Sequence, residues 1–176
     1  MERSNEADKI EGLSKQVGVY MINDNISKMI ELCIRKKGYL FQLLELTKRQ
    51  ESIIDEDKLD ELVNILKEKE EIMEKVDDLD SHFIRLFVQL KEEEKIDSFE
   101  KLPIEKYANA KELKALVNEI NNIVNNLTIL DKNNIAKMKA SIEKTKTDLK
   151  NVKLSIRANK GYGIGDVGSV FIDEKK

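Results

Sequence analysis

The sequence predicts an all-α protein: an elongated antiparallel three-helix bundle of coiled-coil type, with a long C-terminal helix and a flexible glycine-rich tail. Charged residues make up 37% of the chain and hydrophobic residues 40%, and the dominance of Glu, Lys, Leu and Ile is typical of long helices. The chain has one Pro and seven Gly, and four of these glycines lie in the last sixteen residues. Aromatic residues are only 5% of the chain, which favours a slender bundle over a thick globular core. The helical bundle is expected over residues 20–160.

The first helix is expected over residues 22–53. Its apolar residues recur at helical spacing, and they are Ile22, Ile26, Met29, Ile30, Cys33, Ile34, Leu40, Phe41 and Leu44. Asn23 or Asp24 can cap its start, and Gly38 inside it costs about 1 kcal/mol relative to Ala. The preceding residues 1–19 are polar and contain two glycines, so we expect a flexible N-terminal leader.

The second helix is expected over residues 57–91, with Asp57 as its cap. Its seam alternates between spacings of three and four, and comprises Leu59, Leu62, Leu66, Lys69, Met73, Val76, Asp80, Phe83, Phe87 and Leu90. That alternation is the period of a coiled coil. The turn at residues 54–56 is so short that the first two helices are predicted to be antiparallel neighbours.

The third helix is expected over residues 104–159, a stretch without Pro or Gly. Pro103 suits the first position of a helical turn, and Asn109 with Glu112 indicates a second start. If residue 104 lies opposite residue 91, the earlier helices end level with Met138. About 20 residues, or roughly 30 Å, would then have no helix to pack against.

This surplus segment carries an apolar stripe, and an exposed stripe of that length usually marks a partner site. The expected partner-binding residues are Met138, Ile142, Thr145, Leu149, Val152 and Ile156. Residues 132–160 hold nine basic and two acidic residues, whereas residues 51–100 hold eighteen acidic and seven basic residues. Lys137, Lys144 and Arg157 are therefore expected to steer acidic partner residues. The formal net charge of −3 argues against general nucleic-acid binding.

Three interpretations of the basic amphipathic segment remain open. The favoured one is a helix that lays its apolar face on a partner protein. The second is a membrane-surface helix, which the lack of Trp and Phe on the stripe disfavours. The third is cover by residues 1–19, whose weak periodicity disfavours it. A structural coiled coil that self-associates through the helical seams is a further alternative for the whole chain.

The sequence offers little for catalysis or metal binding. It has one His and one Cys, His82 and Cys33, and a metal site needs several converging ligands. No glycine-rich phosphate-binding loop follows a predicted strand. We therefore predict that the protein is not an enzyme and uses no metal or cofactor. The single Cys favours a reducing compartment, and neither a signal peptide nor a membrane-spanning stretch is visible, so a cytoplasmic protein without stable membrane insertion is expected.

The last residues, 161–176, combine alternate glycines with apolar side chains. The glycines should end the third helix and leave the chain flexible. Apolar residues in a flexible segment indicate a short recognition motif that orders on binding. The expected motif residues are Tyr162, Phe171 and Ile172.

Several segments together resemble the FlgN-type flagellar export chaperones. They are Leu-Leu-Glu-Leu-Thr-Lys (43–48), Leu-Lys-Glu-Lys-Glu-Glu-Ile (66–72), Leu-Asp-Lys-Asn-Asn (130–134), Gly161-Tyr162, and the closing Gly-Ser-Val-Phe-Ile-Asp-Glu-Lys-Lys (168–176). The resemblance covers roughly residues 22–176, and the tail is its most specific element. The asparagine-rich residues 118–134 and the N-terminal leader depart from the family pattern.

The resemblance implies a small cytoplasmic helical chaperone without ATPase activity. Such proteins bind the hook-filament junction proteins before secretion, prevent premature assembly and help deliver them to the type III export gate. The family's client contact lies toward the C-terminal helical region, which agrees with the stripe on the surplus segment. The resemblance also suggests that Tyr162 and Phe171 contribute to docking at the export gate.

Overall fold

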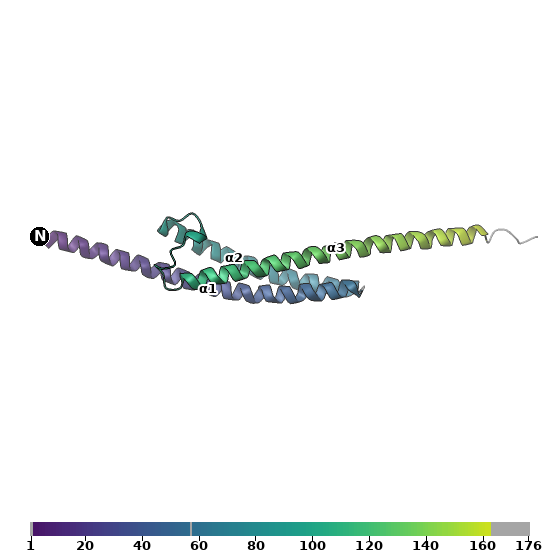
Figure 1. Cartoon of the computed structure of the whole chain (residues 1–176), viewed down its shortest axis with the longest axis horizontal. Coiled ribbons are helices and arrows are strands. Elements are labelled where there is room, and N and C mark those ends of the chain that lie inside the picture. The colour runs from purple at the N-terminus through teal and green to yellow at the C-terminus, as the bar shows by residue number, and fades with distance from the viewer. Residues whose placement is uncertain (1, 57, 163–176) are drawn as a thin grey trace, which may run out of the picture. The chain divides into compact units, whose positions relative to one another are not determined.

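The computed structural model describes residues 2–56 and 58–162, although the side chains of residues 2–11, 13–15, 59 and 159–162 are not described. Helix α1 spans Glu2–Asp55, α2 spans Leu59–Glu94 and α3 spans Ala110–Tyr162, with a short 3-10 turn, η1, at Phe99–Lys101 (Figure 1). The described part of the chain contains no strand. The predicted all-α class with three long helices is therefore confirmed, and the glycine-rich tail lies outside the described residues.

Helices α1 and α2 form an antiparallel pair. The Lys36 ammonium lies 2.6 Å from the Asp80 carboxylate, and Lys69 donates a hydrogen bond of 3.0 Å to Gln50. Residue numbers on α2 thus decrease as the numbers of their contacting residues on α1 increase, which is the order expected of antiparallel helices. In the turn between them, the N-cap of α2 is Lys58, without a side-chain hydrogen bond. This replaces the expected cap, Asp57, which lies outside the described residues.

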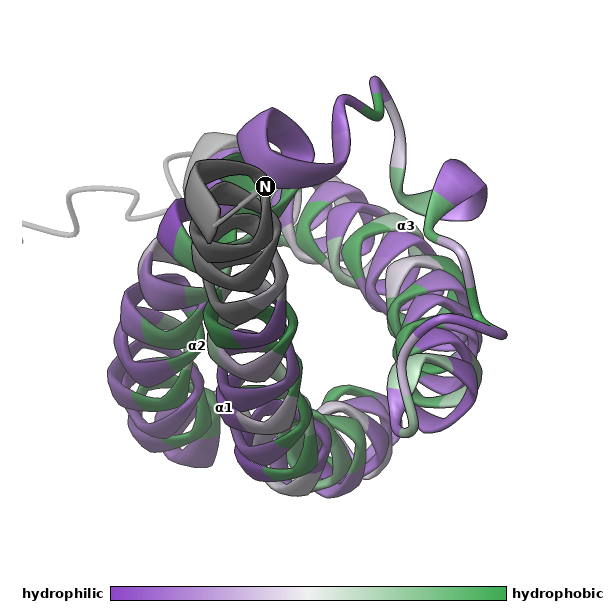
Figure 2. Cartoon of the chain, turned by 90° about the vertical axis from the view of Figure 1, so that its left-hand side faces the viewer, coloured by the Kyte–Doolittle hydropathy of each residue, from purple (hydrophilic) through white to green (hydrophobic). Residues whose placement is uncertain are grey.

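Helix α3 runs parallel to α1 and antiparallel to α2. Lys37 of α1 pairs with Glu119 at 2.5 Å, and farther along both helices the Asn134 amide donates to the Thr47 carbonyl at 2.9 Å. Lys69 of α2 pairs with Asp131 at 2.5 Å. Each helix in Figure 2 alternates between hydrophobic and hydrophilic bands, as amphipathic helices do when they bury one side.

The core lies along the facing sides of the three helices and extends into the 95–109 connection. Its fully buried members include Ile26, Met29, Leu90, Leu102, Tyr107 and Leu113. Leu102 and Tyr107 belong to the connection, and Phe99 packs edge-on against Phe87 with ring centroids 5.6 Å apart. The connection between α2 and α3 is therefore a packed part of the bundle rather than an exposed linker.

The structure corrects the predicted seams of α1 and α2. Leu66 and Met73 are 46% and 53% exposed, and the residues beside them, Ile65 and Ile72, are buried instead. Both sets fit the same alternation of three and four with Leu62, Lys69 and Val76, so periodicity alone cannot choose between them. The position of α1 decides which set is buried. Ile34 and Phe41 of the predicted first stripe are also exposed.

Two helix starts differ from the predicted ones. Helix α1 begins at Glu2 rather than near residue 22, because Gly12 and Gly18 remain in the helix and no described glycine adopts a positive φ. Glycine lowers helix stability but ends a helix mainly when it takes the left-handed conformation. Helix α3 begins at Ala110 rather than 104, because Tyr107 turns into the core. The Asn109 carbonyl accepts the first helical hydrogen bond, from Leu113 at 3.0 Å.

Candidate partner-binding surface on α3

The chain divides into two compact units, residues 1–134 and 135–176. The described part of the second unit is the C-terminal portion of α3. Every described side chain from residue 142 to residue 158 is exposed. On the predicted stripe, Ile142 is 45%, Leu149 54%, Val152 54% and Ile156 50% exposed, whereas Met138 is half-buried. These residues follow spacings of three and four along a continuous helix, so they share one face. We call this set, with Thr145, the α3 stripe.

Thr145 interrupts the apolar residues of the α3 stripe without leaving an unsatisfied polar group. Its hydroxyl donates to the Ser141 carbonyl of the same helix at 3.0 Å. Thr147 makes the equivalent bond to Glu143 at 2.9 Å. Because this bond occupies the Thr145 hydroxyl, a partner helix can pack against the side chain without separately satisfying that donor.

Sequence reasoning missed two exposed apolar residues in this unit. Ile135, one turn before Met138, continues the α3 stripe, and Leu154 lies on the opposite side of the helix; both are 52% exposed. The spacing of three from Ile135 to Met138 could have identified Ile135.

The described side chains of the second unit form a basic surface around the α3 stripe. Residues 135–158 include seven basic residues and two acidic ones. One acid, Glu143, pairs with Lys146 at 2.6 Å. Of the predicted steering residues, Lys144 and Arg157 are exposed and Lys137 is half-buried. The surface offers apolar contact and positive charge together, which suits an amphipathic helix with acidic edges.

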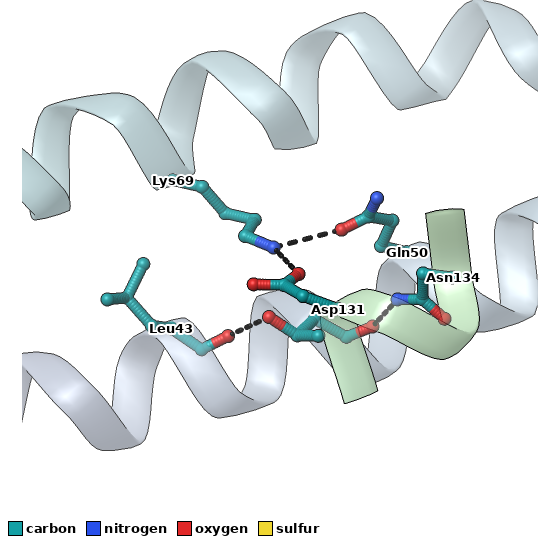
Figure 3. Close-up of polar contacts among 6 residues, drawn as sticks. Leu43, Gln50, Lys69, Asp131 and Asn134 are labelled. Carbon is teal, nitrogen blue, oxygen red and sulfur yellow. Dashed lines mark hydrogen bonds and ion pairs between the residues drawn. The ribbon is translucent and has the colours of Figure 1, made fainter. Parts of the chain in front are cut away.

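A layer of buried polar side chains lies in the first unit near Asn134, the last residue of that unit (Figure 3). Lys69, only 8% exposed, reaches between the side chains of Gln50 and Asp131, and so joins all three helices. Thr47 donates to the Leu43 carbonyl at 2.7 Å. Asn134 is 1% exposed; its amide nitrogen donates to the Thr47 carbonyl, while its side-chain oxygen has no hydrogen-bond partner among the described residues. Polar groups in a coiled-coil core favour one alignment of the helices, since any other leaves them unpaired.

The remaining candidate chemical groups have structural environments. Cys33 is buried, and burial raises the pKa of its thiol to about 11, so the thiol stays protonated near neutral pH. His82 is exposed and lies 3.6 Å from Asp78. Among the described residues, no group of three or more His, Cys, Asp or Glu side chains is placed to hold a metal ion. The described helices include none long and apolar enough to cross a membrane.

The predicted tail motif cannot be placed in the same way. Tyr162 ends α3, but its side chain is not described. Phe171 and Ile172 lie outside the described residues. The role of these three residues stays a prediction.

Comparison with protein-family models identifies the family of the chain. A family model described as FlgN protein matches residues 21–164. The chain belongs to the FlgN family. This match includes most of the described helical region, and it ends before the closing motif at residues 168–176. FlgN proteins are flagellar export chaperones that bind flagellar proteins, and the family is not known for enzymatic activity. No curated protein and no solved structure matches the chain.

Proposed function

We propose that this FlgN-family protein binds hook-filament junction proteins in the cytoplasm through the α3 stripe, prevents their premature assembly and delivers them for export. The observation that carries the proposal is the uniform exposure of Ile142, Leu149, Val152 and Ile156 on one helical face. Residues this apolar are normally covered in a functional complex when they line up on a surface.

The proposed mechanism is capture of one helix by another. An apolar helix of the client lies along the α3 stripe, and the mutual burial of apolar side chains drives association. Lys144 and Arg157, both exposed, attract acidic residues of the client and raise the rate of encounter. While bound, the client helix cannot pair with another junction protein. The tail residues Tyr162, Phe171 and Ile172 remain a proposed docking motif for the export gate.

The test compares two faces of the same helix. Introducing Ile142→Asp together with Leu149→Asp should abolish binding of a purified junction protein from the same organism, measured by calorimetric titration. The free energy of unfolding should change by less than about 0.5 kcal/mol, because both side chains are already exposed. Leu154→Asp is the matched control: it places the same charge on the opposite face and should leave binding intact.

Other results would favour the alternative functions. A large loss of stability in the double variant would identify the α3 stripe as core, and the proposed site would be wrong. Unchanged client binding would also reject the site. Binding to anionic vesicles that weakens with added salt would support a membrane-surface adaptor, and a concentration-dependent oligomer abolished by the same variant would support a self-associating coiled coil.

A further inference from the structure

A second surface lies between α1 and α2, far in sequence from the α3 stripe. A hollow of about 400 Å³ is lined by four residues of α1 and four of α2: Lys28, Glu31, Leu32, Arg35, His82, Arg85, Leu86 and Gln89. A second hollow of about 450 Å³ is lined by Phe41, Gln42, Glu45, Leu46, Glu68 and Ile72. In each hollow, half-buried or buried apolar residues of both helices lie among charged or polar ones.

The two hollows lie along the same face of the helix pair. On α1, Lys28, Arg35 and Gln42 are seven residues apart, so they follow one line along the helix. Between the hollows, the Lys75 ammonium lies 5.8 Å from the centre of the Tyr39 ring, which joins α2 to α1 on this face. We call the whole feature, from Lys28 to Leu46 on α1, the α1–α2 groove. At 1.5 Å per residue it is about 27 Å long, enough for five helical turns.

Helix α3 packs on another side of α1. Its contacts there involve Lys37, which pairs with Glu119, and the Thr47 carbonyl, which accepts from Asn134. At 100° per residue, Lys37 points away from the line through Arg35 and Gln42. The bundle therefore buries one side of the α1–α2 pair under α3 and leaves the α1–α2 groove on the other side.

The two ends of the groove carry opposite charge patterns. At one end, Lys28 pairs with Asp24 at 2.5 Å and His82 lies 3.6 Å from Asp78, and Glu31 adds a further carboxylate. Arg35 and Arg85 line the same hollow, and neither has an ion-pair partner among the described residues. Unpaired guanidinium groups on two neighbouring helices suit a carboxylate that approaches between them.

The other end of the groove is acidic. Glu45 and Glu68 line it from α1 and α2, around an apolar floor that includes Leu46 and Ile72. Glu45 pairs with Lys48 at 2.9 Å in an exposed contact, which contributes little to stability. A ligand that fits the whole groove must therefore carry apolar side chains for the two hollows, acidic residues toward the arginines and basic residues toward the glutamates.

Gly38 supports a close approach of another chain at the middle of the groove. It lies seven residues from Glu31 and seven from Glu45, so it shares their face of α1. A Cβ atom at Gly38 would meet no atom of the described residues within 4 Å, and the φ of Gly38 is not positive. The fold itself thus gives no reason for a glycine that costs about 1 kcal/mol in a helix interior. A backbone packed close to Gly38 in a complex supplies a reason.

From these observations we propose that the α1–α2 groove binds an amphipathic helix of a second protein partner. The acidic residues of that helix face Arg35 and Arg85, and its basic residues face Glu45 and Glu68. The groove and the α3 stripe use different residues. The groove has a basic end and an acidic end, whereas the surface around the α3 stripe is basic, so the two sites favour helices with different charge patterns. The proposal does not depend on the function proposed for the α3 stripe.

The experiment uses a designed helical peptide of about 18 residues and the full-length chain. The peptide carries leucines at spacings of three and four, glutamates in its first two turns and lysines in its last two turns. A control peptide has the same composition with the leucines scattered around the helix. Fluorescence anisotropy titrations should show saturable binding of the first peptide and none of the control.

Variants of the chain then locate the site. Arg35→Glu with Arg85→Glu should weaken binding about tenfold or more, and a peptide with lysines in place of the glutamates should recover it. Gly38→Leu, which blocks the middle of the groove, should weaken binding as strongly without lowering the free energy of unfolding. Ile142→Asp with Leu149→Asp should leave peptide affinity unchanged, which separates this site from the α3 stripe.

The proposal would be overturned by any of three results. The scattered control could bind as well as the designed peptide, which would show nonspecific adhesion. Arg35→Glu with Arg85→Glu and Gly38→Leu could all bind normally, which would place the peptide elsewhere. The chain could form a concentration-dependent dimer that the peptide dissociates, which would show that a second copy of this chain occupies the groove.

Discussion

The two portions of α3 carry the same apolar pattern in opposite environments. Leu113, Ile120 and Leu127 are seven residues apart, and all are buried in the first unit. In the second unit, Ile142, Leu149 and Ile156 have the same seven-residue spacing, offset by one residue from the first series, and all are about half-exposed. A heptad pattern therefore specifies a helical face that can be buried, whereas the neighbouring elements determine whether that face is buried in the free chain.

Truncation of one leucine in each portion of α3 should change the free energy of unfolding by very different amounts. Leu113→Ala should lower the free energy of unfolding by about 3 kcal/mol, because it removes a fully buried side chain and leaves a cavity. Leu149→Ala should change it by less than about 0.5 kcal/mol, since the side chain is already in solvent. Urea unfolding followed by circular dichroism measures both. Equal losses in the two variants would contradict the division into core and surface.

An intermediate effect concerns charges in the two regions. Asp131→Ala should cost about 2 kcal/mol, because it leaves the buried Lys69 ammonium with only the Gln50 side chain as partner. Lys69→Met should be nearly neutral, since the replacement fills similar space and Asp131 can be solvated. In the second unit, Glu143→Ala removes an exposed pair with Lys146 and should cost less than about 0.5 kcal/mol.

The free energies of unfolding of these three charge variants are also measured by urea unfolding. A loss from Lys69→Met as large as that from Asp131→Ala would show that the polar layer is net stabilising rather than a device for alignment. A large loss from Glu143→Ala would show that the exposed pair is part of a tertiary contact.

The smallest effect is a pH dependence expected only in the first unit. Burial opposes the ionised form of Glu94, but hydrogen bonds from Lys106 and Tyr107 outweigh it and hold its pKa below the ordinary value of 4.5. A lowered pKa contributes stability that is present above the ordinary value and is lost as pH falls through the folded value. Glu94→Gln should therefore cost about 1 kcal/mol at pH 7, and the difference from wild type should shrink below about pH 4.5.

The matched control for this effect is Glu143→Gln in the second unit. Glu143 lies on an exposed pair, so this variant should follow the wild-type unfolding curve at every pH. A difference between wild type and Glu94→Gln that stays constant down to pH 3 would show that the ionisation of Glu94 does not contribute.

Much of the bundle could be predicted from local sequence. The scarcity of Pro and Gly, the alternation of three and four, and the short turn before α2 predict three helices with antiparallel neighbours. The start of the regular α3 helix after Asn109 also follows from a local capping pattern, although the predicted range began at residue 104. These features depend on backbone propensity and side-chain spacing within a few residues, and both are contained in the sequence itself.

Other features depended on residues far apart in the chain. Ile65 rather than Leu66 is buried because of where α1 lies. Helix α3 begins at Ala110 rather than residue 104 because the Tyr107 side chain packs into the core. Lys69, a break in the predicted seam, is paired by Gln50 and Asp131 from two other helices. The α1–α2 groove also needs both helices, since each supplies half of its lining. The sequence determined which faces of each helix are apolar, and only tertiary packing decided which of them are covered, because burial depends on contacts between distant segments.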